Sequence, residues 1–72
     1  MALMFDLPID KKVYDFIVEF MDTNGFAPTH TEISEYLGRK TFGSVGKILH
    51  RLKDQEHISF VPNKKRGIRL LN

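Results

Sequence analysis

Cysteine is absent from this chain of 72 residues, so neither a disulfide nor a thiolate-bound zinc can hold it together. Packing of apolar side chains must stabilise the fold, and a cytoplasmic protein is the default expectation. Long apolar runs are lacking as well. Residues 1–5 are apolar, but Asp6 and Pro8 interrupt them far short of a secretory signal or a membrane span. We therefore expect no targeting signal and no membrane partner.

Groupings of residues that carry out chemistry are also missing. The three histidines, His30, His50 and His57, have no cysteine or carboxylate at ligand spacing, which argues against a metal site. No nucleophile is evidently paired with a base, and no glycine-rich phosphate loop follows a strand. The sequence therefore predicts neither an enzyme nor a protein with a metal or a small-molecule cofactor.

The charge is small in total but unevenly distributed. Seventy-two residues suffice for one small domain, and we expect a single domain over 1–72. Residues 1–37 carry seven acidic and two basic side chains, a net charge of −5, whereas residues 38–72 carry nine basic and two acidic side chains, a net charge of +7. A basic half suits a polyanionic partner, although a solvated basic surface is the plainer alternative.

Three helices are predicted by apolar residues spaced three and four apart, over residues 7–23, 29–37 and 42–55. The first follows an apolar N-terminal arm, residues 1–6, with Asp6 as its cap and Pro8 in its first turn. Gly25 and Gly38 provide the left-handed residues that end the first two helices.

Capping residues predict where the second and third helices start, and the composition of the C-terminal segment predicts the rest of the fold. Thr29 and Glu32 have the spacing of a capping box, and Thr41 can cap the third helix. Two short runs rich in branched and aromatic residues predict a β-hairpin within 58–71. Because a lone hairpin is not stable, its apolar face must pack on the helices; that face consists of Ile58, Phe60, Ile68 and Leu70. The expected class is α+β: a three-helix bundle with a C-terminal two-stranded antiparallel wing, the winged helix-turn-helix.

The helix at 42–55 is the predicted recognition helix for double-stranded DNA. Its inward stripe consists of Val45, Ile48, Leu49 and Leu52, which turns small and polar residues outward. Such a surface can approach base edges in the major groove. We expect Lys47 to contact bases, Ser44 to contact either a base or a phosphate, and His50 and Arg51 to contact the DNA backbone. Gly43 and Gly46 each lower helix propensity by roughly 1 kcal/mol relative to alanine, which predicts a soft first turn. A solvated helix face is the alternative.

The predicted wing places three positive charges at its tip, namely Lys64, Lys65 and Arg66. We interpret this tip as a clamp for phosphates or for the minor groove, so that it contributes to affinity rather than to sequence choice. Thr29 and His30 lie where the second helix begins, and free N–H groups at a helix N-terminus favour an anion such as phosphate. The plainer alternatives are a solubility feature at the tip and an exposed first-turn residue at His30.

Several motifs resemble the DNA-binding domain of LexA-type repressors over about residues 7–71. They are Gly25, Phe26, Ala27, Pro28 and Thr29; Glu32, Ile33, Leu37 and Gly38; Ser44, Val45, Leu49, Arg51 and Leu52; and Ile58 with Arg66, Gly67, Ile68, Arg69 and Leu70. The patterns G-x-x-P-T-x-x-E-I and R-G-I-R-L at this separation are fairly specific, whereas the helix pattern occurs in many winged-helix families.

The resemblance implies base contacts by residues at the start of the recognition helix and a backbone contact by Arg66. The base-contacting positions are Thr41, Gly43, Ser44, Gly46 and Lys47. Gly43 and Gly46 depart from the family, which usually has polar residues there. The family's second half, a self-cleaving Ser/Lys peptidase that also forms the dimer, has no counterpart in these residues.

Two functions follow as hypotheses. The first is a stand-alone, sequence-specific, repressor-like transcriptional regulator at the nucleoid, of the kind that phages and mobile elements encode. The alternative is a protein-interaction module that binds a repressor or RNA polymerase through spare apolar residues, Leu3, Met4, Phe5 and Val18. A homodimer through the first helix and the arm is compatible with both. RNA binding is a third, weaker hypothesis, because no stacking aromatic residues lie within the basic surface.

Overall fold

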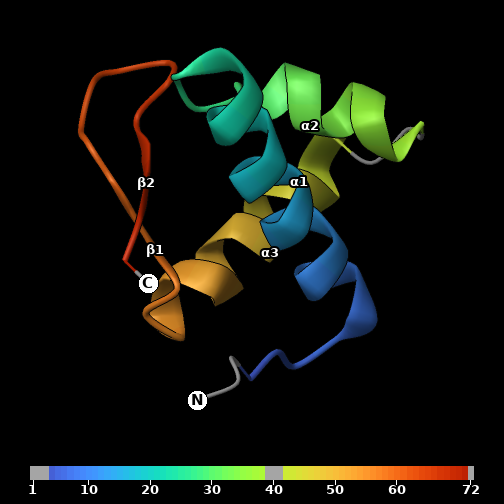
Figure 1. Cartoon of the computed structure of the whole chain (residues 1–72). Coiled ribbons are helices and arrows are strands. Elements are labelled where there is room, and N and C mark those ends of the chain that lie inside the picture. Colours follow the sequence, from blue (N-terminus) through green and yellow to red (C-terminus); the bar gives the residue numbers. More distant parts are fainter. Residues whose placement is uncertain (1–3, 39–41, 72) are drawn as a thin grey trace.

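Three helices and a two-stranded antiparallel sheet make up the computed structural model, which describes residues 4–38 and 42–71, the side chains of residues 42–44 excepted (Figure 1). The elements are α1 (Pro8–Asn24), α2 (His30–Leu37), α3 (Phe42–Asp54), β1 (Ile58–Phe60) and β2 (Ile68–Leu70). The expected α+β class, a winged helix-turn-helix, is confirmed. No helix within the described residues is both long enough and apolar enough to span a membrane.

Helix α1 begins one residue later than expected, and its predicted cap is wrong. Leu7, not Asp6, occupies the N-cap position, and no side chain caps the helix there. Pro8 explains the difference: proline has a helical φ and no N–H to satisfy, so it suits the first helical position and the helix starts directly at it. The helix ends at Asn24, one residue later than expected, and Gly25 follows it in the expected role: its φ of 79° is left-handed and its N–H donates to the Met21 carbonyl at 2.8 Å.

The predicted capping box opens α2. The Thr29 N–H donates to Glu32 Oε1 at 2.8 Å, and the Glu32 N–H donates to Thr29 Oγ1 at 3.1 Å. Gly38 ends the helix with a φ of 65°. Helix α3 begins at Phe42, as expected, and ends at Asp54 rather than at residue 55. Its predicted cap, Thr41, lies outside the described residues.

The core lies where the three helices and the sheet meet. Its most deeply buried side chains are Val13 and Ile17 of α1, Ile33 of α2, Val45, Leu49 and Leu52 of α3, and Ile58 of β1. The strands pair with Ile58 opposite Leu70 and Phe60 opposite Ile68. Ile58 and Ile68 are buried, whereas Leu70 is half-buried and Phe60 is 37% exposed. The hairpin therefore packs on the helices mainly through the two isoleucines.

Part of the N-terminal arm packs on this core. The Phe5 ring lies 4.7 Å from the His57 ring and 5.4 Å from the Tyr14 ring. His57 is buried in the turn after α3, and its Nε2 is hydrogen-bonded to the Met4 carbonyl. Burial raises the pKa of the Tyr14 hydroxyl. Met4 itself is exposed, and Leu3 lies outside the described residues.

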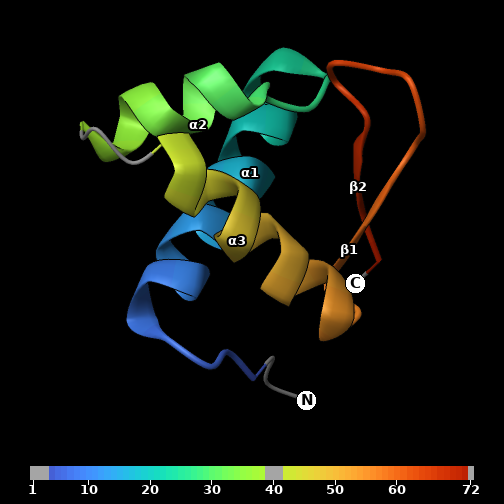
Figure 2. The ribbon, with the colours of Figure 1, turned by 180° about the vertical axis from the view of Figure 1, so that it is seen from behind.

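The wing lies along one side of the helices, and the loop joining its strands reaches the connection between α1 and α2. Figures 1 and 2, which view the molecule from opposite sides, both show this. Gly67 is required in that loop, because a Cβ there would lie 2.6 Å from the Val61 carbonyl oxygen and 3.0 Å from that of Lys64. The tip thus lies close to the N-terminus of α2.

Candidate nucleic-acid interface

Helix α3 presents the outward face that its periodicity predicts. Val45, Ile48, Leu49 and Leu52 are buried, whereas Gly46, Lys47 and His50 are exposed. His50 Nδ1 lies 3.3 Å from Asp54 Oδ2, one turn along the same face. Gly43 and Ser44 belong to the first turn of α3, and the side chain of Ser44 lies outside the described residues. Lys47 has no acidic partner within the described part of the chain.

Gly46 opens into a hollow beside this face. A Cβ built on Gly46 meets no atom within 4 Å, so the fold itself does not require glycine at this position. The hollow has a volume of about 270 Å³, and its walls come from α2, α3 and β1: they are His30, Gly46, Leu49, His50 and Phe60. The side of α3 that faces outward is therefore small and partly apolar at its middle.

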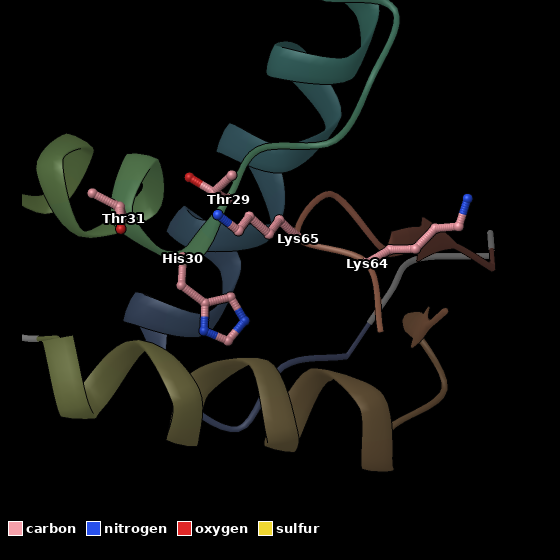
Figure 3. Close-up of a pocket in the computed structure, with 5 residues that line it drawn as sticks. All are labelled: Thr29, His30, Thr31, Lys64 and Lys65. Carbon is pink, nitrogen blue, oxygen red and sulfur yellow. The ribbon is translucent and has the colours of Figure 1, made fainter. Parts of the chain in front are cut away.

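A second hollow of about 480 Å³ lies between the start of α2 and the wing, lined by Thr29, His30, Thr31, Lys64 and Lys65 (Figure 3). In Figure 3, His30 points from α2 toward α3, Lys65 extends beside Thr29, and the Lys64 ammonium points away from the helix. Because His30 lines both hollows, the N-terminus of α2, the outward face of α3 and the basic wing form one continuous surface. We call this surface the interface face.

Arg51, which we expected to contact the DNA backbone, forms an ion pair within the protein. Its guanidinium binds Asp10 of α1, with Nη2 donating to Oδ1 at 2.7 Å and Nε donating to Oδ2 at 3.0 Å. Asp10 is fully buried, and the Arg51 side chain is 33% exposed. The hydrogen bonds to Asp10 raise the pKa of Arg51. Arg51 thus fastens α1 to α3, and its expected contact with the DNA backbone stays a prediction.

Sequence reasoning missed Asp10, although a signal was available. Asp10 precedes Val13 by three residues, Tyr14 by four and Ile17 by seven, so it continues the buried stripe of α1. A carboxylate on a buried stripe needs a cationic partner, because burying an unpaired charge is costly. The partner is Arg51, 41 residues further along the chain.

Arg66 is also bound within the protein. Its Nη1 donates to the Ala27 carbonyl at 2.9 Å and to Glu32 Oε1 at 2.7 Å, and its Nη2 donates to Glu32 Oε2 at 3.2 Å. Its guanidinium carbon lies 4.6 Å from the centre of the Phe26 ring. The hydrogen bonds from Arg66, and next the one from the Thr29 N–H, lower the pKa of Glu32. The backbone contact that the resemblance implies for Arg66 stays a prediction.

The described residues contain no cluster of three or more histidine, cysteine or acidic side chains that could hold a metal ion. What they bring together is a helix N-terminus, an outward helix face and two wing lysines on one surface, held by a three-helix core. The fold and this surface define a winged helix-turn-helix domain.

Comparison with known proteins identifies the family. A family model described as the LexA DNA-binding domain matches residues 8–67, and the chain belongs to this family. The chain is 34% identical over 65 residues to a LexA repressor from Syntrophobacter fumaroxidans, covering 89% of this chain and 32% of the relative. It is 34% identical over 64 residues to a LexA repressor from Vibrio cholerae, covering 89% and 31%. The chain thus spans about a third of the length of these relatives. The matched part corresponds to the DNA-binding domain that the family model describes, a non-catalytic regulatory domain.

Proposed function

We propose that this domain is a sequence-specific, double-stranded DNA-binding transcriptional repressor module, which places α3 in the major groove and the wing on the DNA backbone. Membership of the LexA DNA-binding family supports the DNA-binding part. A protein of this kind works in the cytoplasm at the nucleoid. Family membership also favours DNA over the alternative, a module that docks on a repressor or on RNA polymerase.

The observation that carries the proposal is the continuous interface face. A recognition helix needs a buried stripe that anchors it and an outward face that approaches base edges without clashing. Helix α3 has both, and Lys47 projects from its exposed face. The N–H groups at the start of α2 and the two wing lysines flank that face, where phosphates of the same duplex would lie.

Each residue then has a distinct role. Lys47 bonds to base edges, guanine being the preferred partner of a lysine in the major groove. Gly46 lets the duplex approach closely, and Thr41, Gly43 and Ser44 meet the bases at the start of α3. Thr29, His30, Lys64 and Lys65 bind phosphates, and His50 borders the backbone. Arg51, which joins α3 to α1, and Arg66, which joins the wing to α2, support these residues through contacts within the protein.

The test is selection of bound sequences from random duplex DNA at a stated salt concentration, with Lys47→Ala beside the wild type. Loss of Lys47 should cost about 1–3 kcal/mol on the selected site and relax the choice at one base pair. Lys11→Ala is the matched control, because Lys11 is exposed on α1, which contributes no residue to the interface face. Absence of any enriched sequence with the wild type would refute sequence-specific binding.

A homodimer through α1 and the arm residues Met4 and Phe5 would suit a two-fold operator, because symmetric sites call for symmetric proteins. Phe5 packs on its own core, whereas Met4 of the arm and Val18 of α1 are exposed. Light scattering over a concentration series measures the mass, and a monomer at the highest concentration would exclude a stable homodimer.

A further inference from the structure

Arg66 and Glu32 join the wing to α2 at one point. Within the part of the chain that the structure describes, the hydrogen bonds that join the loop 61–67 to α2 and to the connection between α1 and α2 come from the Arg66 side chain. The strands below that loop are only three residues long each. The position of the tip relative to α2 therefore depends strongly on this one side chain.

Glu32 serves two structures at once. Its Oε1 accepts the Thr29 N–H in the capping box and also accepts the Arg66 guanidinium. The bidentate pairing of a planar guanidinium with a carboxylate fixes direction as well as distance. The Phe26 ring covers the guanidinium, and Phe20 of α1 holds that ring in turn, with 5.9 Å between the two ring centres. Arg66 is thus oriented by two helices and the loop between them.

The neighbouring lysines are in a different situation. Lys64 and Lys65 are exposed, and neither has an acidic partner among the described residues. They line the hollow at the N-terminus of α2 together with Thr29 and His30. Lys65 directly precedes Arg66 in the chain, so the attachment of Arg66 to α2 also determines where Lys65 lies.

We propose that Arg66 and Glu32 are positioning residues, which hold Lys64 and Lys65 beside the N-terminus of α2 so that wing and helices engage one DNA backbone together. This inference rests on the proposed DNA-binding function. It gives Arg66 a role other than the direct phosphate contact that the family resemblance implies. The Glu32 carboxylate partly neutralises the Arg66 charge, and the Ala27 carbonyl occupies a further donor, so the binding to phosphate falls to the lysines.

Glu32→Gln distinguishes a positioning role from a purely electrostatic effect of the Glu32 charge, because the two predict changes in DNA affinity of opposite sign. Glutamine can still complete a capping box, so α2 keeps its start. Removing a negative charge close to a phosphate would by itself strengthen DNA binding. If the ion pair positions the wing, binding should weaken instead. The expected change is on the order of eightfold at 0.1 M salt for each lysine that no longer reaches its phosphate, since neutralising one phosphate changes the affinity by about 0.9 decade between 1 M and 0.1 M salt.

Glu35→Gln is the matched control. Glu35 is exposed on the same helix, is not among the hydrogen-bond or ion-pair partners of Arg66 in the described residues, and its substitution makes the same change in charge. Both variants are compared with the wild type on the selected duplex over a range of salt concentrations. We expect the salt slope of Glu32→Gln to fall by about 0.9 if one lysine leaves its phosphate and by about 1.8 if both do, while that of Glu35→Gln is unchanged. Equal or tighter binding by Glu32→Gln than by Glu35→Gln would overturn the proposal.

Arg66→Lys tests the pair from the other side. The charge is conserved, so a residue acting as a point charge on a phosphate would keep the salt slope, whereas a positioning residue that needs its planar fork would not. We expect Arg66→Lys to lower the DNA affinity and its salt slope as Glu32→Gln does. The double variant with both substitutions should bind DNA little more weakly than either single variant, because the same interaction is removed in all three. An unchanged slope in Arg66→Lys would contradict a positioning role.

Amide hydrogen exchange provides a measurement that needs no DNA. Exchange at residues 61–67 should accelerate in Glu32→Gln and in Arg66→Lys but not in Glu35→Gln. Unchanged wing exchange in both test variants would refute the positioning role whatever the protein binds. Conversely, faster wing exchange together with no duplex binding by the wild type would refute the proposed function and leave the attachment of the wing intact.

Discussion

Replacing Gly46 by alanine should stabilise the fold and weaken DNA binding. Gly46 lies within α3 and does not have a positive φ, so its backbone accepts any L-residue. No atom lies within 4 Å of the added Cβ, so the methyl group meets no clash inside the protein. Alanine is favoured over glycine in a helix interior by roughly 0.8–1.0 kcal/mol. For a domain of this size, that gain raises the melting temperature by about 4–8 °C.

The same methyl group projects into the hollow on the interface face, where the proposed function places a base pair. Preventing one close approach should cost about as much as one mismatched base pair, about 1–3 kcal/mol, or roughly 5-fold to 150-fold in affinity. Thermal unfolding followed by circular dichroism measures the first effect, and fluorescence anisotropy with the selected duplex measures the second.

Gly25→Ala provides the comparison. Gly25 has a φ of 79° at the end of α1, so alanine there should lower the stability, the opposite of the effect expected at Gly46. The reasoning fails if Gly46→Ala melts at a lower temperature than the wild type. It fails equally if the variant gains stability and binds the duplex as tightly as before.

Three further predictions concern the charged residues. Lys64→Ala combined with Lys65→Ala should lower the salt slope of DNA binding by about 1.8 with little change in the selected sequence, and a slope equal to that of the wild type would contradict the assignment of phosphate contacts. Arg51→Ala leaves the buried Asp10 carboxylate unpaired and should destabilise the domain by about 2 kcal/mol or more in urea unfolding. This is somewhat below the cost of breaking a fully buried pair, because the Arg51 side chain is 33% exposed. A loss of DNA affinity without a loss of stability would show instead that Arg51 binds DNA. The pKa of Glu32 is lowered in the folded state, so its contribution to stability is fully present above the ordinary glutamate pKa of about 4.3 and is lost as the pH falls through the lower folded pKa. The stability of Glu32→Gln should therefore depend less on acid pH than that of Glu35→Gln. Equal pH dependences of the two variants would contradict this.

The helices could be predicted from the sequence because each depends on local patterns. The spacing of Thr29 and Glu32 specifies a capping box within four residues, and Gly25 and Gly38 can adopt the positive φ that ends a helix. The start of α1 was misplaced because both Asp6 and Pro8 signal a helix start, and only the structure shows that Pro8 takes the first position.

The partners of the charged residues could not be predicted, because they are distant in sequence. Periodicity placed Arg51 on the outer face of its helix, but a long side chain can reach a carboxylate on a neighbouring helix. The basic run that contains Arg66 predicts a DNA contact, and the composition of that run does not show that Glu32, 34 residues earlier, lies beside Arg66. Tertiary pairing determines which of the eleven basic residues remain available for a polyanion.

The packing of Phe5 affects how this domain should be excised for use elsewhere. The family model matches residues 8–67, yet Phe5, Ile68 and Leu70, which belong to the core or pack against it, all lie outside those limits. A fragment cut at the family boundaries would lose one aromatic ring and two aliphatic side chains from its packing, together with the hydrogen bond between the Met4 carbonyl and His57. Chimeric regulators built on this domain should therefore retain residues 4–71.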